Sequence, residues 1–156
     1  MGSNYSFNQG GYGMDYHAKK FTELTTKEFF EIVKLRIAVF VVEQNCPYQE
    51  VDDADEQAWH TWLQEGSEIV GYTRIIDKGD TVTFGRVLIN PVYRGKKLGN
   101  KLLEETLKVI KDNYPERPII IGAQAHLTDF YGAFGFEEIS EVYLEDDIPH
   151  VDMRKS

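Results

Sequence analysis

The sequence contains one cysteine, Cys46, and few basic residues for its length. A single thiol excludes an intramolecular disulfide and cannot supply a zinc cluster. The chain lacks a long uncharged apolar stretch and the apolar segment of a secretory signal, so we expect no membrane partner and a cytoplasmic location. Lys and Arg number 17 against 26 Asp and Glu, a formal net charge of −9. Nucleic-acid binding depends on clustered basic side chains, so no nucleic-acid partner is expected.

The sequence has enough hydrophobic residues to form the core of one domain. The chain has 156 residues, of which 42% are hydrophobic and 13% aromatic, and this size supports a single compact core. Residues 1–14 are rich in Gly, Asn, Ser and Tyr and have no apolar periodicity. We therefore interpret 1–14 as a disordered leader or a cloning remnant, and 15–156 as the folded domain.

The spacing of apolar residues predicts the order of helices and strands. The turn signals "EGSE" and "DKGD" separate three strand-like runs as hairpins. The predicted helices are 27–42, 97–113 and 127–134, and the predicted strands are 18–24, 59–63, 68–77, 81–89, 119–125, 136–143 and 150–154. This alternation predicts an α/β domain with a mixed central sheet flanked by helices on both faces.

The first predicted helix has a clear start and an ambiguous end. Thr25 or Thr26 precedes Glu28 in the pattern of a capping box. The β-branched tail "IAVFVV" is compatible with either helix or strand. For Arg36 and Glu43 the first interpretation is an ion pair within the helix, and the second is a pair of polar contacts that line a ligand pocket. The apolar face of this helix is expected to comprise Phe29, Phe30, Val33, Ile37 and Phe40 or Val41.

The loop after this helix is strongly acidic. Between Pro47 and Gln57 the sequence has five carboxylates and no cation. Two interpretations stay open for this loop: a solvated surface, or an electrostatic trap for a cationic substrate.

Positive charge is concentrated in one stretch, "NPVYRGKKLGNKLLEETL" at 90–107. Here a strand is stopped by Pro91, and a turn leads into the second predicted helix. Helix N-termini expose unpaired N–H groups and carry a partial positive charge, so glycines at 95 and 99 would let these amides approach an anion closely. The nearby cations are Arg94, Lys96, Lys97 and Lys101, and the apolar stripe of the helix is Leu98, Leu102, Leu103, Leu107 and Ile110. The combination suits a pyrophosphate, and the alternative is a solvated cationic turn.

The spacing of the glycines excludes two common phosphate-binding motifs. Gly99 is followed by Asn100 and Lys101, whereas the P-loop of nucleotide hydrolases requires Lys and then Ser or Thr after its second glycine. The dinucleotide-binding pattern G-x-G-x-x-G is also absent from this turn.

Three separated motifs resemble the GNAT family of N-acetyltransferases, and in particular its ElaA-like branch of small bacterial proteins. The segment "RGKKLG" at 94–99 matches the family's coenzyme-binding pattern Q/R-x-x-G-x-G/A. The segment "QAHLTDFYGAFGFEE" matches a later family motif, with Gln124 where Asn is usual. "RIAVFVVEQNCPYQEVDDAD" and "EDDIPHVDM" resemble the ElaA-like branch, so the resemblance covers nearly all of 21–155.

The resemblance implies that the chain moves an acetyl group from acetyl-CoA, as cosubstrate, to a primary amine by direct attack in a ternary complex. A catalytically idle acyl-CoA-binding module is the alternative. The acceptor would be a small-molecule or peptide amine, and relatives often form homodimers. Main-chain groups of Val87, Leu88 and Ile89 are expected to pair with the pantetheine arm. The other residues expected to bind the coenzyme are Arg94, Gly95, Lys96, Lys97, Leu98, Gly99, Asn100 and Gln124.

One residue departs from the family pattern of the coenzyme turn. Lys97 stands where relatives usually have the first glycine of the motif. If this position requires a positive φ, a lysine costs roughly 1 kcal/mol. Pyrophosphate binding would survive, because it depends on several amides.

Tyr131 matches the tyrosine that acts as general acid in the family, which protonates the departing thiolate. The alternative is that Tyr131 is a core aromatic, because Phe130, Phe134 and Phe136 surround it in sequence. No Ser or Cys nucleophile motif accompanies it, which favours direct transfer.

The general base is left open by the sequence. Many relatives carry a glutamate on the strand that corresponds to 81–89, but this strand has no carboxylate. The remaining candidates are Glu50, Asp52, Asp53, His60, His126 or solvent. His60, His126 and His150 do not have the spacing of a metal site, so we expect no metal.

Overall fold

A computed structural model of the chain describes residues 3–6 and 14–156. These residues form a mixed sheet with the strand order β1-β2-β3-β4-β5-β6-β9-β7, and β8 pairs with the same edge of β9 as β7 does. The strands are β1 Ser3–Ser6, β2 Met14–Lys20, β3 Trp59–Glu65, β4 Glu68–Asp77, β5 Val82–Ile89, β6 Ile119–Gln124, β7 Glu137–Glu138, β8 Tyr143–Glu145 and β9 Ile148–Lys155. The α-helices are α1 Thr26–Ile37, α2 Leu98–Asn113 and α3 Thr128–Gly132. Shorter helical turns are η1 Phe21–Glu23, η2 Ala38–Glu43, η3 Asp53–Glu56, η4 Pro91–Tyr93 and η5 Ala125–Leu127.

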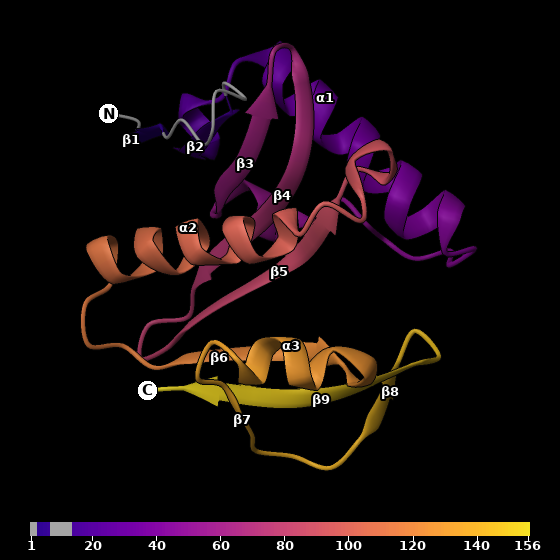
Figure 1. The fold of residues 1–156 in the computed structure, drawn as a ribbon, viewed down its shortest axis with the longest axis vertical. Coiled ribbons are helices and arrows are strands. Elements are labelled where there is room, and N and C mark those ends of the chain that lie inside the picture. Colours follow the sequence, from indigo (N-terminus) through magenta and orange to yellow (C-terminus); the bar gives the residue numbers. More distant parts are fainter. Residues whose placement is uncertain (1–2, 7–13) are drawn as a thin grey trace.

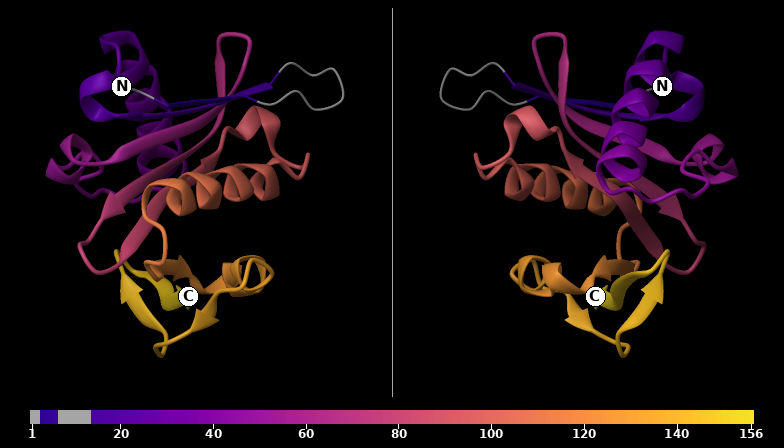
Figure 2. Two further views of the ribbon diagram at one scale, coloured as in Figure 1. Left: turned by 90° about the vertical axis from the view of Figure 1, so that its left-hand side faces the viewer. Right: turned by 90° about the vertical axis from the view of Figure 1, so that its right-hand side faces the viewer.

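The sheet separates two layers of helices. Figure 2 shows α1 on one face of the sheet and α2 on the other, with α3 on the same side as α2. One hydrophobic cluster lies under α2 and includes Leu102, Val70 and Phe84, and a smaller one lies under α1 and includes Ile32 and Tyr72. The predicted α/β domain with a mixed sheet and helices on both faces is therefore confirmed. Within the described residues, no helix is both long and apolar enough to cross a membrane.

The N-terminal part of the sheet differs from the prediction. Residues 3–6 were expected within a disordered leader, but they form β1 and pair with β2 from Ser3↔Ala18 to Ser6↔Asp15. Backbone pairing along an open sheet edge needs no apolar pattern, which explains why the composition did not reveal this strand. Met14, the last residue of the predicted leader, begins β2, and the other leader residues, 1–2 and 7–13, lie outside the described residues. The strand predicted at 18–24 is also wrong in its bounds, because β2 ends at Lys20 and η1 follows.

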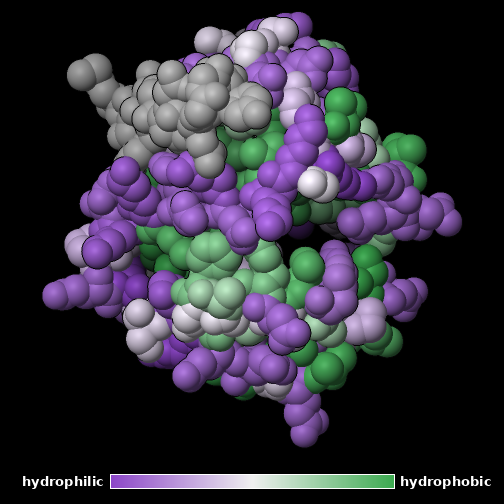
Figure 3. Space-filling view, viewed as in Figure 1, coloured by the Kyte–Doolittle hydropathy of each residue, from purple (hydrophilic) through white to green (hydrophobic). Residues whose placement is uncertain are grey.

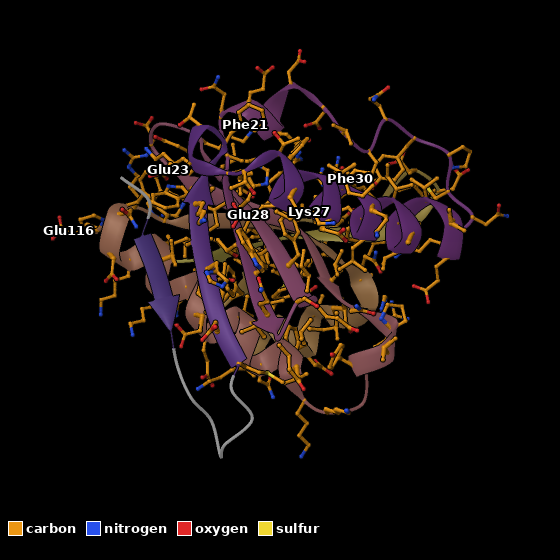
Figure 4. All side chains as sticks on the ribbon, turned by 90° about the horizontal axis from the view of Figure 1, so that it is seen from above. Phe21, Glu23, Lys27, Glu28, Phe30 and Glu116 are labelled. Atoms are coloured by element: carbon orange, nitrogen blue, oxygen red, sulfur yellow. The ribbon has the colours of Figure 1, made fainter. Side chains whose placement is uncertain are left out.

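Helix α1 begins as the sequence predicts. The Thr25 hydroxyl accepts a hydrogen bond from the backbone N–H of Glu28 at 3.0 Å, and the Glu28 carboxylate accepts one from the Thr25 N–H at 2.8 Å. Figure 4 views α1 lying across the sheet, with Glu28 and Phe30 labelled along it. The ambiguous tail is helical, because α1 continues into η2 as a turn of π-helix.

The buried face of α1 differs from the predicted apolar face. Phe30 is 57% exposed and Ile37 is also exposed, whereas the buried positions of α1 and η2 are Ile32, Arg36 and Val39. The prediction counted only apolar residues, and it failed because a charged residue, Arg36, occupies the centre of the buried stripe. Its charge is compensated by acidic residues that are distant in sequence.

Helix α2 follows its predicted stripe closely. Leu102, Leu103 and Ile110 are buried against the sheet, together with Thr106 and Val109. The Thr106 hydroxyl lies 3.0 Å from the Thr73 hydroxyl of β4, so even the polar residue of the stripe has a partner in the sheet. Because α2 is fixed to the sheet along its length, the position of its N-terminus is defined by the core.

The C-terminal strands differ from the prediction of one strand at 136–143. Only Glu137–Glu138 form β7, and the chain pairs again at β8. A tight turn at Asp146 and Asp147, with φ of 50° and 63°, joins β8 to β9 as a hairpin. Both central residues of a type I′ turn have positive φ, and Asp tolerates this conformation. The sequence "EDDI" lacks the usual glycine, so this turn was missed.

Candidate active site

The sheet opens between β5 and β6, its parallel pair of strands. Among the described residues the two strands pair only at Val82↔Ile119, and beyond this point they diverge, as Figure 1 shows. The gap is the entrance to a cavity of about 750 Å³ lined by residues from both strands, from η2 and the loop after it, and from the β8–β9 hairpin. Figure 3 shows a hollow in the surface between α2 and α3. Most of the β5 edge facing this gap therefore has no partner strand.

A β-bulge distorts β5 beside the gap. In the register with β4, Tyr72 pairs with Leu88 and Arg74 pairs with Gly85, so Arg86 and Val87 both stand opposite Thr73. Arg86 has a φ of 49°, a conformation that is unusual for a residue with a side chain. Bulges redirect backbone groups and end regular pairing. The predicted pantetheine-pairing residues Val87, Leu88 and Ile89 follow the bulge directly and line the cavity.

The basic turn lies at the end of β5, where it leads into α2. Lys97 is the N-cap of α2 in the left-handed conformation, with φ of 59° and ψ of 26°, and its side chain caps no backbone N–H. The first turn of α2 contains no acidic residue. Gly95 also has a positive φ, of 82°, and Gly99 lies against Phe130 of α3. The first-turn amides of α2, including those of the predicted residues Leu98, Gly99 and Asn100, thus have no side-chain cap.

The conformation of Lys97 explains the one departure from the family pattern. The backbone there does adopt the positive φ that favours glycine. The Lys97 side chain is exposed, so it meets no steric obstacle in the core. Lys96, next to it, extends over the Tyr93 ring with 5.5 Å between its ammonium and the ring centroid.

Arg94 is oriented by two contacts. Its guanidinium forms two hydrogen bonds of 2.7 Å with the Glu43 carboxylate, and its Nε donates to the carbonyl of Ile89 at 3.2 Å. This pairing raises the pKa of Arg94 and lowers that of Glu43. The predicted ion pair between Arg36 and Glu43 is therefore wrong. Instead, Glu43 at the end of η2 holds Arg94 at the wall of the cavity.

Tyr131 of α3 lines the same cavity from the face of the sheet that carries α2. Its ring contacts Phe84, Phe130 and Phe136, and the side chain is 5% exposed. Burial raises the pKa of the Tyr131 phenol to about 12, so the hydroxyl stays protonated at neutral pH. Within the described part of the chain, no residue hydrogen-bonds this hydroxyl. Tyr131 thus combines the core packing and the cavity lining that the sequence left as alternatives.

The two histidines predicted as candidate bases, His60 and His126, differ in their surroundings. His60 is fully buried, and its ring nitrogens lie 2.6 Å from the Tyr72 hydroxyl and 2.9 Å from the carbonyl of Asp55. Burial lowers the pKa of His60 to about 4. Because both nitrogens are occupied inside the protein, His60 is excluded as a base. His126 of η5 is exposed at the cavity, as is the half-buried Gln124 at the end of β6.

The acidic loop contributes its carboxylates to a buried ionic network. The Arg36 guanidinium is 3.0 Å from the Glu50 carboxylate and 2.7 Å from the Asp55 carboxylate. Arg74 contacts Asp52 at 2.7 Å and Asp55 at 3.1 Å. Burial alone would lower the pKa of Arg36, but Tyr72, Asp55 and Glu50 raise it above its usual value. For Asp55, burial acts to raise the pKa, and the hydrogen bond and charge of Arg36 lower it overall.

Arg86 joins this network from the bulge. Its Nε lies 2.8 Å from the Glu50 carboxylate, and its Nη2 donates to the carbonyl of Glu50 at 2.9 Å. Glu50 and Asp52 are therefore held by arginines, which removes both from the list of free bases. Three arginines neutralise three of the five carboxylates, so the loop is not the electrostatic trap that its charge suggested. Asp53 and Glu56 are exposed.

His150 of β9 is a cavity-lining residue that the sequence did not single out as a base. It is 8% exposed and stands opposite Gln124 in the pairing of β6 with β9. The motif "EDDIPHVDM" contained it, but a sequence pattern gives no information on which face of the strand a histidine occupies. Among the described residues, no group of three or more His, Cys, Asp or Glu side chains could hold a metal ion.

The fold and this site define the class of protein. Residues 22–156 match the family described as an acetyltransferase (GNAT) domain, so the chain belongs to the GNAT acetyltransferase family. Protein ElaA of Escherichia coli is 42% identical over 139 residues, which cover 86% of this chain and 91% of ElaA. A UPF0039 protein of Schizosaccharomyces pombe is 37% identical and covers 90% of this chain and 96% of its own. The predicted family, including its ElaA-like branch, is confirmed.

Solved structures agree with the sequence comparison. The crystal structure of an acyl-CoA N-acyltransferase from Pseudomonas aeruginosa has a TM-score of 0.89 at 40% identity and covers 92% of this chain and 99% of its own. The crystal structure of Escherichia coli ElaA has a TM-score of 0.87 at 40% identity, with coverage of 90% and 99%. Both solved chains match this chain over nearly their full length, so the fold as a whole is shared.

Proposed function

We propose that this protein transfers an acetyl group from acetyl-CoA to a primary amine, by direct attack of the amine while both substrates are bound. The observation that carries the proposal is the uncapped N-terminus of α2 at the end of the β5–β6 gap. A gap between parallel strands suits an extended arm, and an uncapped helix N-terminus suits a diphosphate. Few other ligands combine these two features in one molecule.

The residues at the gap fit acyl-CoA in a defined order. The amides of Leu98, Gly99 and Asn100 would hold the diphosphate, with the charges of Lys96 and Lys97 beside them. The free edge of β5 after the bulge would hold the pantetheine arm by main-chain hydrogen bonds, in the manner of an added strand. The coenzyme supplies the thioester that the amine attacks.

Tyr131 is suited to donate a proton to the departing thiolate. A phenol with a pKa of about 12 keeps its proton at neutral pH, as a proton donor must. Its hydroxyl faces no competing acceptor among the described residues. The acceptor is proposed only as a small-molecule or peptide amine, because side chains of both charges line the cavity.

Two measurements test the proposed function. Acetyl-CoA at about 100 times its Kd should stabilise the fold by about 2.7 kcal/mol, a Tm rise of roughly 5–10 °C, whereas ATP and NAD should have little effect. Thiol release from acetyl-CoA should then increase with at least one member of a panel of primary amines. Stabilisation without thiol release would support an idle acyl-CoA-binding module. Equal stabilisation by all three nucleotides would contradict the proposal.

Tyr131→Phe tests the assigned proton donor. The variant keeps the aromatic packing and loses only a hydroxyl without protein partners, so acetyl-CoA affinity should stay within about twofold while kcat falls by roughly 10²–10⁴. Tyr114→Phe, at the far end of α2, serves as the matched control and should leave both values unchanged. A parallel loss of affinity and turnover in Tyr131→Phe would assign the residue to binding or packing.

A further inference from the structure

We propose that His150 is the general base that accepts the proton of the attacking amine, an inference that rests on the proposed acetyl transfer. His150 and Tyr131 line one cavity from opposite faces of the sheet. Val151 and Ala123 pair across β9 and β6 and belong to the same hydrophobic cluster as Tyr131. Because side chains alternate along a strand, the neighbouring pair His150 and Gln124 faces the other way. An acid and a base on opposite sides of a thioester fit the geometry of direct displacement.

The hydrogen bond of its other nitrogen fixes the tautomer of His150. Nδ1 lies 2.7 Å from the carbonyl oxygen of Ile148. A carbonyl oxygen only accepts, so Nδ1 must carry the hydrogen. In the neutral imidazole Nε2 is therefore the unprotonated nitrogen, with a lone pair available for a proton. The bond to Ile148 also sets the orientation of the ring before any substrate binds.

One acidic and one aromatic side chain of β8 lie against the His150 ring. The Glu145 carboxylate of β8 lies 3.5 Å from Nε2, longer than a good hydrogen bond. The ring of Tyr143 stacks on the imidazole with 6.1 Å between centroids. The Tyr143 hydroxyl donates a hydrogen bond of 2.6 Å to the Asp152 carboxylate. The other titratable or charged side chains that line this cavity are Cys46, Tyr48, Arg74, Arg86, Arg94, His126, Tyr131 and Asp146.

The other candidates lack this combination. His60 has both nitrogens occupied, and Glu50 and Asp52 pair with arginines. His126 is exposed, and within the described residues no hydrogen bond orients its ring. His150 is the candidate that is buried at the cavity wall and oriented by a backbone carbonyl, with an Nε2 whose nearest acidic group, the Glu145 carboxylate, lies 3.5 Å away.

The step that follows balances without any further reactant. The amine nitrogen bonds to the thioester carbonyl carbon, and its proton goes to Nε2 of His150. The bond between that carbon and sulfur breaks, the electron pair leaves with sulfur, and the sulfur takes the proton of the Tyr131 hydroxyl. Solvent then returns a proton to Tyr131 and removes one from His150, which gives the amide and free CoA.

An NMR measurement tests the geometry without substrate. In the ¹⁵N-labelled free protein at about pH 8, long-range correlations of the imidazole nitrogens should assign His150 to the Nδ1–H tautomer, which is the minor form of histidine in water. The signals are assigned by their absence from His150→Asn. An Nε2–H tautomer would overturn the proposal, because its lone pair would then face Ile148.

Kinetics of His150→Asn test the role itself. Asparagine keeps an N–H donor for Ile148 and removes the basic nitrogen, so folding and acetyl-CoA binding should persist while kcat falls roughly 10²–10⁴-fold with the best amine of the panel. The dependence of kcat/KM on a basic group of the free enzyme should also disappear from the pH profile. His17→Asn, in β2 and outside the cavity lining, is the matched control and should keep the wild-type profile.

The outcomes separate this inference from the proposed function. If acetyl-CoA does not bind the wild type or no amine releases thiol, the proposed function fails, and the NMR result still decides the tautomer. If the wild type is active and His150→Asn keeps its rate and pH profile, only the assignment of His150 is overturned.

Discussion

Two groups of basic residues in this molecule differ in their burial and in their pairing with carboxylates. Arg36 of α1 and Arg74 of β4 are buried, 0% and 6% exposed, and each contacts two carboxylates within 3.1 Å. Lys96 and Lys97 lie exposed in the turn before α2. The buried arginines are neutralised inside the protein, whereas the exposed lysines leave positive charge beside an uncapped helix N-terminus.

Buried, paired cations and exposed cations have different roles in a protein. A buried ion pair must be compensated by its own protein, and removing one partner leaves the other as an unpaired buried charge. The Arg36 network therefore holds the acidic loop and, through Arg86, the bulge of β5. An exposed cation costs little to solvate and stays available to attract an anion. The buried arginines therefore support the structure around the site. The exposed lysines contribute a positive electrostatic potential beside it.

The largest effect is expected from breaking the buried group. Arg36→Leu removes one of the two arginines that pair with Glu50 and one of the two that pair with Asp55, so the free energy of unfolding should fall by about 3–5 kcal/mol in urea titrations. Arg94→Leu removes an exposed arginine with a similar two-point contact to a carboxylate and should have a much smaller effect. Equal losses in the two variants would contradict the division into structural and functional cations.

The second prediction concerns the protonation of His60, which is buried beside the arginine network. His60 has a pKa of about 4 in the fold, against 6.5 without burial, so the unfolded chain binds more protons between these values. Stability should therefore fall as the pH drops from 6.5 to 4, by on the order of 3 kcal/mol in urea titrations, and this contribution should change no further below pH 4. His60→Gln should flatten that part of the profile. His126→Gln, an exposed control, should leave it unchanged.

The smallest effect is expected in the exposed turn. Lys97 has a left-handed backbone, and glycine relieves this strain, so Lys97→Gly should raise the free energy of unfolding by about 1 kcal/mol. Lys96→Gly removes the same charge at a residue without positive φ and should give no gain. Differential scanning calorimetry measures both. A loss of stability in Lys97→Gly would mean that the lysine side chain contributes more than its backbone costs.

The same contrast explains what the sequence could predict. The α2 stripe and the α1 cap are local patterns, because their residues are neighbours along the chain, and both predictions are confirmed. The buried network joins residues far apart in sequence, such as Arg36 with Asp55 and Arg86 with Glu50. No periodicity marks such pairs, so the loop was interpreted by its charge alone, and the apolar face of α1 was assigned without Arg36.

The site itself was predictable only in part. The family motifs indicated Tyr131 and the basic turn. Tyr131 and Arg94 line one cavity, whereas residues 95–100 of the turn are not among its lining residues. His60 and His126 were named because they are histidines near expected strand or helix ends. His150 differs from them by a hydrogen bond to Ile148 and by the face of β9 that it occupies, and both features depend on the β8–β9 hairpin whose turn was missed.

The central claim is that the N-terminal amides of α2 hold the diphosphate of acetyl-CoA, and Gly99→Asp tests it most directly. An added Cβ at Gly99 meets Phe130 only at 3.7 Å, and a carboxylate in the first turn of a helix favours folding. Isothermal titration should therefore find acetyl-CoA affinity at least about 100-fold weaker in a variant that is no less stable. Asn113→Asp, the same charge change at the other end of α2, should bind normally. Unchanged affinity in Gly99→Asp would contradict the account.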